Sequence, residues 1–407
     1  MNMPWHTVLR VSVAPRVGVL LLLWLFAYSG NVTELVTHGY WESVAAQSTS
    51  LLVWTAPAVA ACGAWEGLRV RRSRALRGAP VRTFGSVSLA ALTPTLILGA
   101  LAVAVALGLL LPQAAGDPGW TTMAVLGLEL LVVAAHTAVG YAIGLSLPRL
   151  LAVPVALVGS FVWMAYPAAM NTFWIRQLNG TNLAECCALD QVVAPRSILA
   201  PMLVSIGLLL AARLVTTRRW GLRILAPVVL TVVVALSAWI AHPLGYGAAE
   251  SRSTALRTCS GTQPRICLWP EQRDAATDIV VWATDAHTRL ASLGVTTATE
   301  LSPRSSTPTS NDVRSLVALS ALPEDIPTCA KYGEWPGSQA HGPLSIWLAV
   351  TAGTDFQVVA SRYAPAEVEV ATRVLERPRQ AQLVWFQQNA KTLTRCDLQP
   401  FLSSEHP

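Results

Sequence analysis

Residues 224–244 constrain the fold more than any other part of the sequence. They read ILAPVVLTVVVALSAWIAHPL and carry no ionisable side chain except His242 near the end. About twenty apolar residues in a helix are long enough to cross the hydrocarbon core of a bilayer. Similar apolar runs precede this stretch, whereas the sequence after it has an ordinary soluble composition. The side on which this helix emerges therefore decides where the C-terminal part of the chain lies.

We expect seven such spans, which form an all-α transmembrane bundle over residues 1–246. The hydrophobic fraction of 53% and the charged fraction of 13% fit this expectation. A short apolar core after Arg10 and Arg16 also resembles a secretory signal, but several spans follow, so we expect it to remain as the first span. The predicted spans are residues 17–30, 48–66, 85–111, 121–147, 151–170, 198–215 and 224–244.

The placement of arginine predicts the orientation of the bundle. Cytoplasmic loops of membrane proteins carry an excess of Lys and Arg. Of the 15 arginines in residues 1–246, only Arg176 and Arg196 fall on one side of the predicted topology. The others are Arg10, Arg16, Arg69, Arg71, Arg72, Arg74, Arg77, Arg82, Arg149, Arg213, Arg218, Arg219 and Arg223. We therefore expect a cell-membrane protein with a cytoplasmic N-terminus and an extracytoplasmic C-terminal domain.

Residues 247–407 are expected to form this small extracytoplasmic α/β (α+β) domain. Helical spacing of apolar residues predicts helices at residues 270–293, 364–375 and 379–391. Two short apolar runs, residues 315–322 and 344–350, look β-like.

Six of the seven cysteines fall on the predicted outer side, which is the oxidising side where disulfides form. The four in the C-terminal domain allow three pairings. We favour Cys259 with Cys267 as a local ring and Cys329 with Cys396 as a link between distant segments. Cys186 and Cys187 lie in the predicted outer loop 171–197. Adjacent cysteines rarely bond each other, so their state stays open.

Glu129 and His136 are ionisable residues within the fourth predicted span. Seven residues are about two helical turns, so the two side chains share a face. Ionisable groups inside a span usually face the bundle interior or a water-filled cavity. One interpretation is a path for a substrate or for protons; the other is hydrogen bonding between helices that fixes their packing. Gly140 and Gly144 in the same span form a GxxxG pair, which is typical of close helix packing.

Glu66 and Arg69 lie one turn apart at the predicted cytoplasmic end of the second span, where a local ion pair is expected. With Arg71 and Arg72 they also suit a short docking helix for a cytoplasmic partner. The sequence has no HExxH, GxSxG, CxxC or glycine-rich phosphate loop. It also lacks a basic stripe with interleaved aromatic residues. We therefore predict no enzymatic activity, cofactor, metal or nucleic-acid partner.

Three segments carry a family resemblance. TAPAVAACGAWEGLRVRR, GYAIGLSLPRLLAVPVA and CSGTQPRICLWPEQR resemble actinobacterial multi-pass membrane proteins of the ABC-exporter permease type. The resemblance covers nearly the whole chain. It implies export through alternating access of a homodimer, driven by a separate cytoplasmic ABC ATPase subunit. It would assign the docking of that ATPase to Glu66, Arg69, Arg71 and Arg72.

The chain departs from the six-span pattern of that family by its seventh span and its exterior domain. The alternative is therefore a membrane-anchored extracytoplasmic sensing or binding protein without transport activity. An exterior hydrolase is less favoured, because no nucleophile–base arrangement can be read from the sequence. In each case membrane lipid surrounds the spans.

Overall fold

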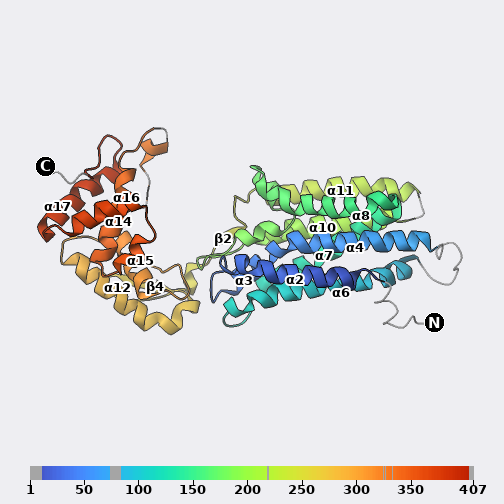
Figure 1. The fold of residues 1–407 in the computed structure, drawn as a ribbon, viewed down its shortest axis with the longest axis horizontal. Helices are drawn as coiled ribbons and strands as arrows, with labels where there is room; N and C mark the ends of the chain where they lie inside the picture. The colour runs from blue at the N-terminus through green and yellow to red at the C-terminus, as the bar shows by residue number, and fades with distance from the viewer. Residues whose placement is uncertain are drawn as a thin grey trace. The chain divides into compact units, whose positions relative to one another are not determined.

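The computed structural model describes residues 12–73, 84–217, 220–323, 325, 327–331 and 333–402. The chain divides into two compact units, Met1–Arg252 and Ser253–Pro407, which we call the transmembrane unit and the C-terminal domain (Figure 1). The division follows Arg252 rather than residue 246, because Ala249–Ser251 form a strand (β2) that pairs with β1 (Gln191–Val193) of the transmembrane unit.

Within the described residues, seven helices of the transmembrane unit are long and apolar enough to cross a membrane, as in a multi-pass membrane protein. Figure 1 shows these helices running side by side. Each corresponds to one predicted span. They are α2 (Ala14–Thr33), α3 with η1 and α4 (Trp41–Ser48, Thr49–Leu51, Leu52–Arg72), α6 (Phe84–Leu110), α7 (Trp120–Ser146), α8 (Arg149–Ala165), α10 (Pro195–Val215) and α11 (Trp220–Ala241).

Short elements connect the long helices. Proline marks two helix starts: Pro148 precedes α8 and Pro195 opens α10, positions where its missing N–H costs no hydrogen bond. The strands β1 and β2 pair antiparallel, with Gln191 opposite Ser251. The remaining short elements are η2 (Leu111–Gln113), η3 (Tyr166–Ala169), α9 (Phe173–Arg176) and η4 (Thr181–Glu185).

Helices α4 and α7 pack with their backbones in direct contact. A Cβ atom added at Gly140 or at Gly144 of α7 would collide with the carbonyl oxygen of Ala60 or of Ala64 in α4. Gly63 of α4 meets the carbonyl oxygen of Thr137 in the same way. Small residues allow this approach, and in a bilayer the resulting van der Waals contact is the main source of helix association.

We expect Gly140→Ala and Gly144→Ala each to lower the free energy of unfolding by roughly 2 kcal/mol, because the added methyl group forces the two backbones apart. The measurement is an SDS titration of the purified protein in mild detergent, followed by circular dichroism. Gly127→Ala is the matched control in the same helix, since a Cβ at Gly127 meets no atom within 4 Å. Equal stability of all three variants would contradict close α4–α7 packing.

The C-terminal domain is an α+β unit with a small three-stranded sheet. Strands β3 (Thr258–Ser260) and β4 (Arg265–Leu268) pair antiparallel, and β4 pairs parallel with β5 (Glu300–Leu301). Its main helices are α12 (Ala276–Ala291), α13 (Ser310–Leu319), α14 (Ser338–Thr351), α15 (Phe356–Ala360), α16 (Pro365–Leu375) and α17 (Arg379–Ala390). Single turns occur at η5 (Thr254–Leu256), η6 (Pro270–Ala275), η7 (Thr328–Lys331) and η8 (Lys391–Thr394).

The β-like interpretation of residues 315–322 and 344–350 is wrong, because residues 315–319 lie in α13, residues 320–322 in the turn after it, and residues 344–350 in α14. Helix α14 is central to the domain, and residues 342–349 are all buried, so no polar face marks the helical period. Helix α13 starts with a capping box in which Thr309 and Asp312 exchange hydrogen bonds. Partial burial would raise the pKa of Asp312, but the bonds from Thr309 and Arg362 outweigh burial and lower that pKa.

Both favoured disulfides of the C-terminal domain are present. Cys259 and Cys267 face each other across β3 and β4 and are bonded. Cys329 in η7 is bonded to Cys396, which follows η8, over a sequence separation of 67 residues. A cross-link stabilises mainly by restricting the unfolded chain, and more so for a longer loop.

We therefore expect Cys329→Ser with Cys396→Ser to destabilise the domain by about 4 kcal/mol, whereas Cys259→Ser with Cys267→Ser costs roughly 2.5 kcal/mol. Urea-dependent proteolysis of the full chain, with cleavage mapped within the C-terminal domain, provides the measurement. A larger loss from the short loop than from the long one would contradict the prediction.

Candidate functional site

Two adjoining cavities of about 430 and 460 Å³ lie among the helices of the transmembrane unit. Both are lined by Val139 and Ile143 of α7, Leu208 of α10 and Leu230 of α11, so together they form one groove, which we call the membrane groove. Aliphatic side chains make up almost all of its wall. The other lining residues are Ala60, His136, Gly140, Ala142, Ser146, Leu147, Val155, Ala156, Gly159, Ser160, Trp163, Val204, Ala211, Ala212, Val215, Ala226, Pro227, Val233 and Val234.

His136, one of the two predicted path residues, lies in the wall of the membrane groove. Its Nδ1 atom is 2.6 Å from Oγ of Ser160 in α8, and its side chain is 6% exposed. The hydrogen bond ties α7 to α8 and leaves the other ring nitrogen for a further partner. His136 therefore holds the wall together and also supplies the groove with a polar group.

Glu129 has different surroundings. It is fully buried, and Oε1 lies 2.9 Å from Oγ of Ser48 in α3. Oγ of Ser48 also lies 2.7 Å from the carbonyl oxygen of Ala45, although a hydroxyl has a single hydrogen to donate. A neutral carboxyl group that donates to Ser48 would satisfy both contacts. Among the described residues, Oε2 has no hydrogen-bond partner.

Both residues lie in α7 at the predicted spacing of two turns, but they contact different helices. They lie about 10 Å apart along α7, because each residue adds 1.5 Å to a helix. At the level of Glu129 the neighbour is Ser48 of α3, and at the level of His136 it is Ser160 of α8. Only His136 lines the groove. Neither serine could be identified from the sequence, because a lone hydroxyl in an apolar run gives no sign of its partner.

We expect Glu129→Gln to change the free energy of unfolding by less than about 1 kcal/mol, because the amide is neutral, has the same shape and can bond Ser48. Glu129→Ala should cost roughly 3 kcal/mol through the cavity and the lost hydrogen bond. SDS titration in detergent compares the two variants. If Glu129→Gln is as destabilising as Glu129→Ala, the neutral carboxyl assignment is wrong.

The four residues considered for docking lie at the end of α4. Glu66 is fully buried; Oε1 accepts a hydrogen bond from Ser12, and Oε2 forms an ion pair with Arg69 at 2.7 Å. Arg71 donates to the carbonyl oxygen of Leu147 at the end of α7. Arg72 is exposed. Glu66 therefore positions Arg69 and does not itself reach a surface.

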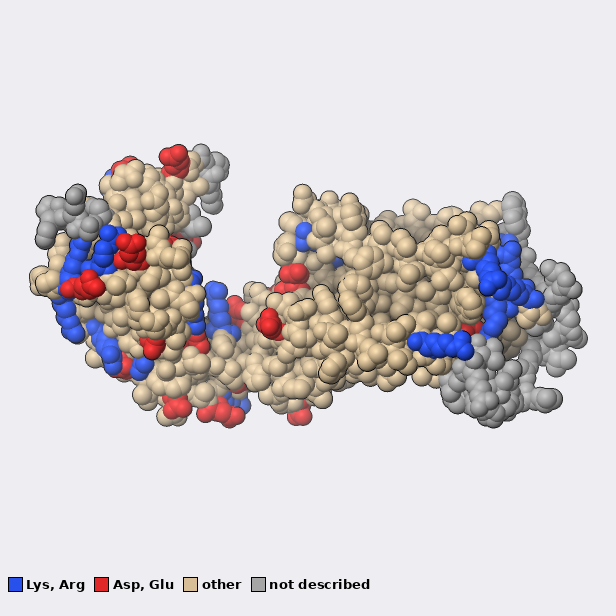
Figure 2. All heavy atoms as spheres, viewed as in Figure 1, with Lys and Arg blue, Asp and Glu red and all other residues tan. Residues whose placement is uncertain are grey.

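Positive charge gathers at this end of the transmembrane unit, and acidic side chains are visible at the opposite end (Figure 2). The described arginines there include those at the C-terminal ends of α4 and α10 and those in the first turns of α8 and α11. Arg10, Arg74, Arg77, Arg82, Arg218 and Arg219 lie outside the described residues. We call this the arginine end of the unit.

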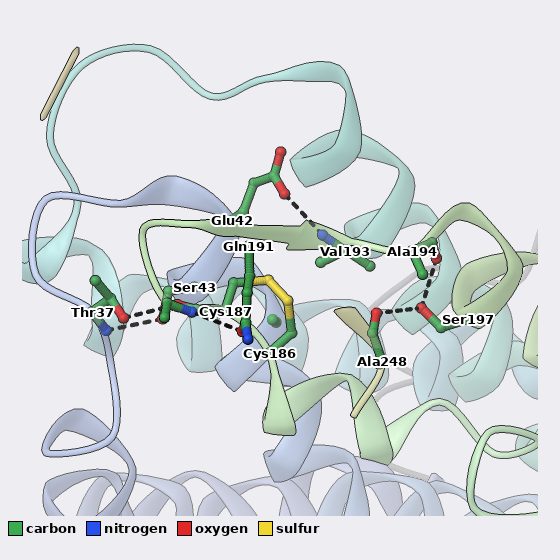
Figure 3. Close-up of a disulfide and its surroundings, with 12 residues drawn as sticks. Thr37, Glu42, Ser43, Cys186, Cys187, Gln191, Val193, Ala194, Ser197 and Ala248 are labelled. Carbon is green, nitrogen blue, oxygen red and sulfur yellow. Dashed lines mark hydrogen bonds between the residues drawn. A yellow bond between two sulfur atoms is a disulfide. The ribbon is translucent and has the colours of Figure 1, made fainter. Parts of the chain in front are cut away.

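A second candidate site lies at the opposite end, where Cys186 and Cys187 are joined by a disulfide (Figure 3). The sequence left their state open. A cavity of about 470 Å³ beside them is lined by Tyr28, Asn31, Val32, Leu35, Thr37, Gln47, Ser50, Ala184, Glu185, Ala188 and Gln191 as well as both cysteines. Its wall therefore mixes polar and apolar groups, unlike that of the membrane groove.

Hydrogen bonds connect the disulfide loop to the start of α3 and to β1. The hydroxyl of Thr37 donates to the carbonyl oxygen of Cys187 at 2.8 Å. The hydroxyl of Tyr40 donates to the carbonyl oxygen of Gln191 at 2.7 Å. The amide of Val193 in β1 donates to Glu42 (Figure 3). The loop, α3 and the two-stranded sheet thus form one bonded cluster.

Comparison with known proteins finds a similarity within the C-terminal domain alone. A family model described as a domain of unknown function (DUF7224) matches residues 266–396. No curated protein and no solved structure matches the chain. The match covers most of the C-terminal domain and none of the seven long helices.

Proposed function

We propose that this protein is a permease-like membrane subunit of an ABC-type export system, driven by a separate cytoplasmic ATPase. The observation that carries the proposal is the membrane groove, which runs among α7, α8, α10 and α11 and has His136 in its wall. A transporter needs an internal cavity whose walls can move relative to each other. A simple membrane anchor has no need of one.

The packing of the helices supports such movement. In the apolar stretch of Trp41–Arg72, 72% of the residues are buried within the protein, against 17% in that of α11. The α4–α7 pair is therefore the buried side of the groove, and α11 lies at the periphery of the bundle, where Val233 packs against Gly207 of α10. Displacement of α11 away from α7 would open the groove without breaking the glycine contacts between α4 and α7.

The arginine end is the cytoplasmic end in this proposal, because Lys and Arg are concentrated in cytoplasmic loops. The ATPase would bind there to Arg69 and Arg72, with Arg71 bonded to α7 and Glu66 holding Arg69 in place. An acidic patch on the ATPase would complement this surface and accelerate its association. The C-terminal domain would lie outside the cell, and two copies of the chain would form the transporter.

The cavity beside Cys186 and Cys187 favours a second candidate, a membrane-anchored extracytoplasmic sensor. Its polar and apolar lining suits a small amphipathic ligand. The loop that forms it is bonded to β1, and β1 pairs with β2 directly before the C-terminal domain. In this alternative a ligand in the cavity would act on the C-terminal domain, and no ATPase would be needed.

Affinity purification of the full chain from native membranes tests the proposal. We expect an ABC ATPase to co-purify, and its yield to fall at least tenfold when Arg69, Arg71 and Arg72 are replaced together by Glu. Arg72→Glu alone is the milder variant, because Arg72 is exposed. Replacing the other two arginines would also remove the ion pair of Arg69 with Glu66 and the hydrogen bond from Arg71 to the carbonyl oxygen of Leu147. A tenfold loss corresponds to about 1.4 kcal/mol of binding free energy.

Arg196→Glu is the matched control, an exposed arginine at the first turn of α10 and thus at the opposite end of the unit. It should leave the yield of ATPase unchanged. Absence of any ATPase from the wild-type preparation would reject the permease proposal and favour the sensor. Equal loss in the control would show that the effect is not specific to the arginine end.

A further inference from the structure

We propose that the membrane groove binds one acyl chain of an anionic phospholipid, whose phosphate lies at Arg223. Only one part of this inference rests on the proposed function, namely that such an amphiphile would be the class of substrate that is transported. Binding itself requires no ATPase. The lining of the groove, its length and the charge at one of its ends all fit such a lipid.

The lining selects a hydrocarbon chain. Apart from His136, Ser146, Ser160 and the indole of Trp163, the groove presents only aliphatic side chains and glycines, and its lining residues include no Asp, Glu, Lys or Arg. An apolar cavity holds water poorly, because water there lacks hydrogen-bond partners. Within the hydrocarbon region of a bilayer, the groove is therefore filled by apolar chains.

The length of the groove matches one leaflet. Along α11 its wall extends from Ala226 to Val234, and Arg223 lies three residues before it. The eleven steps from Arg223 to Val234 span roughly 16 Å at 1.5 Å per residue. Half of a hydrocarbon core of about 30 Å is nearly the same length. An acyl chain whose headgroup lies at Arg223 would thus end near the bilayer centre, at the level of the His136–Ser160 pair.

Arg223 supplies the charge complementarity. Ala226, Pro227 and Leu230 follow it by three, four and seven residues, so all four lie on the groove side of α11. Arg223 is exposed, and its Nε donates to the carbonyl oxygen of Thr217 at 2.9 Å. That bond holds the guanidinium beside Thr217, directly after the end of α10.

Arg213, in the last turn of α10, lines a different cavity together with Ser88 and Tyr141, so Arg223 is the guanidinium that the proposal places at the end of the groove. A guanidinium at the end of an apolar groove suits the phosphate of a lipid, which arginine binds through paired hydrogen bonds. Basic pockets between transmembrane helices are a recurrent site for anionic headgroups. A zwitterionic lipid would gain less, since its own cation offsets the phosphate.

Photocrosslinking locates the acyl chain. The full-length protein is reconstituted into phosphatidylcholine vesicles containing a small fraction of phosphatidylglycerol with a diazirine in mid-chain, and labelled peptides are identified by mass spectrometry. We expect labelling to concentrate on the groove-lining residues of α8 and α11. Gly159→Leu should reduce it to the level of lipid-facing helices, because a Cβ at Gly159 meets no atom within 4 Å and the larger side chain extends into the groove.

Gly127→Leu is the matched control. It adds the same side chain at an exposed glycine of α7 that also has no atom within 4 Å of its Cβ and does not line the groove. Its labelling pattern should equal that of the wild type. Uniform labelling of all spans in the wild type would overturn the inference. So would protection of the groove that increases with protein concentration, because a second copy of the chain would then be the occupant.

Native mass spectrometry measures the headgroup preference. The wild type should retain phosphatidylglycerol over phosphatidylcholine of the same chains, and Arg223→Gln should lower this preference about fivefold, the factor expected for one arginine near an anionic headgroup. Arg16→Gln, at an exposed arginine of α2, is the control and should have no effect. No preference in the wild type would contradict the headgroup assignment.

Inorganic phosphate distinguishes the source of the phosphate group. If millimolar phosphate displaces phosphatidylglycerol, the site recognises the free anion and the acyl-chain assignment is wrong. Both measurements use the protein without any ATPase. Lipid binding in the absence of a co-purifying ATPase would therefore support this inference while rejecting the permease proposal, and the converse result would do the opposite.

Discussion

The close contact between α4 and α7 is the constraint on which the rest of the transmembrane unit depends. Gly63, Gly140 and Gly144 bring the two backbones together, and no larger residue fits at any of the three positions. Lipid gives helices no hydrophobic reason to associate, so such contacts must supply the attraction. The other long helices then arrange themselves around a pair that cannot slide or separate at small cost. A cavity beside this pair has one rigid wall by construction.

Helix α7 has different surroundings at two positions along its length, at Glu129 and at His136. Glu129 is fully buried beside Ser48, and one of its carboxyl oxygens has no hydrogen-bond partner in the part of the chain that the structure describes. Two turns further along, His136 meets Ser160 and lines the groove. Interhelical packing and a path for a ligand were alternative interpretations of this pair of residues. In the structure Glu129 lies in an interhelical contact only, whereas His136 lies both in such a contact and in the wall of the groove.

The sequence predicted the seven long helices well, because the apolar content of a span is a local property that the bilayer itself demands. It failed at residues 344–350, where burial on all sides of α14 removes the polar face that reveals helical period. His136 was identifiable because an ionisable residue is conspicuous in a span. Ser160 could not be identified, because its partner lies on a neighbouring helix. Arg223 was counted only as one of thirteen flanking arginines, because the groove beside it is visible only in the structure. The disulfide between adjacent Cys186 and Cys187 could not be predicted either, because adjacent cysteines rarely bond each other.

The connection between the two units gives the groove and the outer cavity a common element. The loop with Cys186 and Cys187 lies between α8 and α10, which are both walls of the groove. It continues into β1, whose partner β2 ends two residues before the C-terminal domain begins. Oγ of Ser197, at the start of α10, lies 2.7 Å from the carbonyl oxygen of Ala194 and 3.1 Å from that of Ala248, on the two sides of this junction (Figure 3). A shift of α8 or α10 would therefore displace β1 and β2, and β2 leads into the C-terminal domain along the chain. In the permease proposal and in the sensor alternative alike, movement would pass through this junction, and binding of an ATPase at the arginine end would distinguish the two.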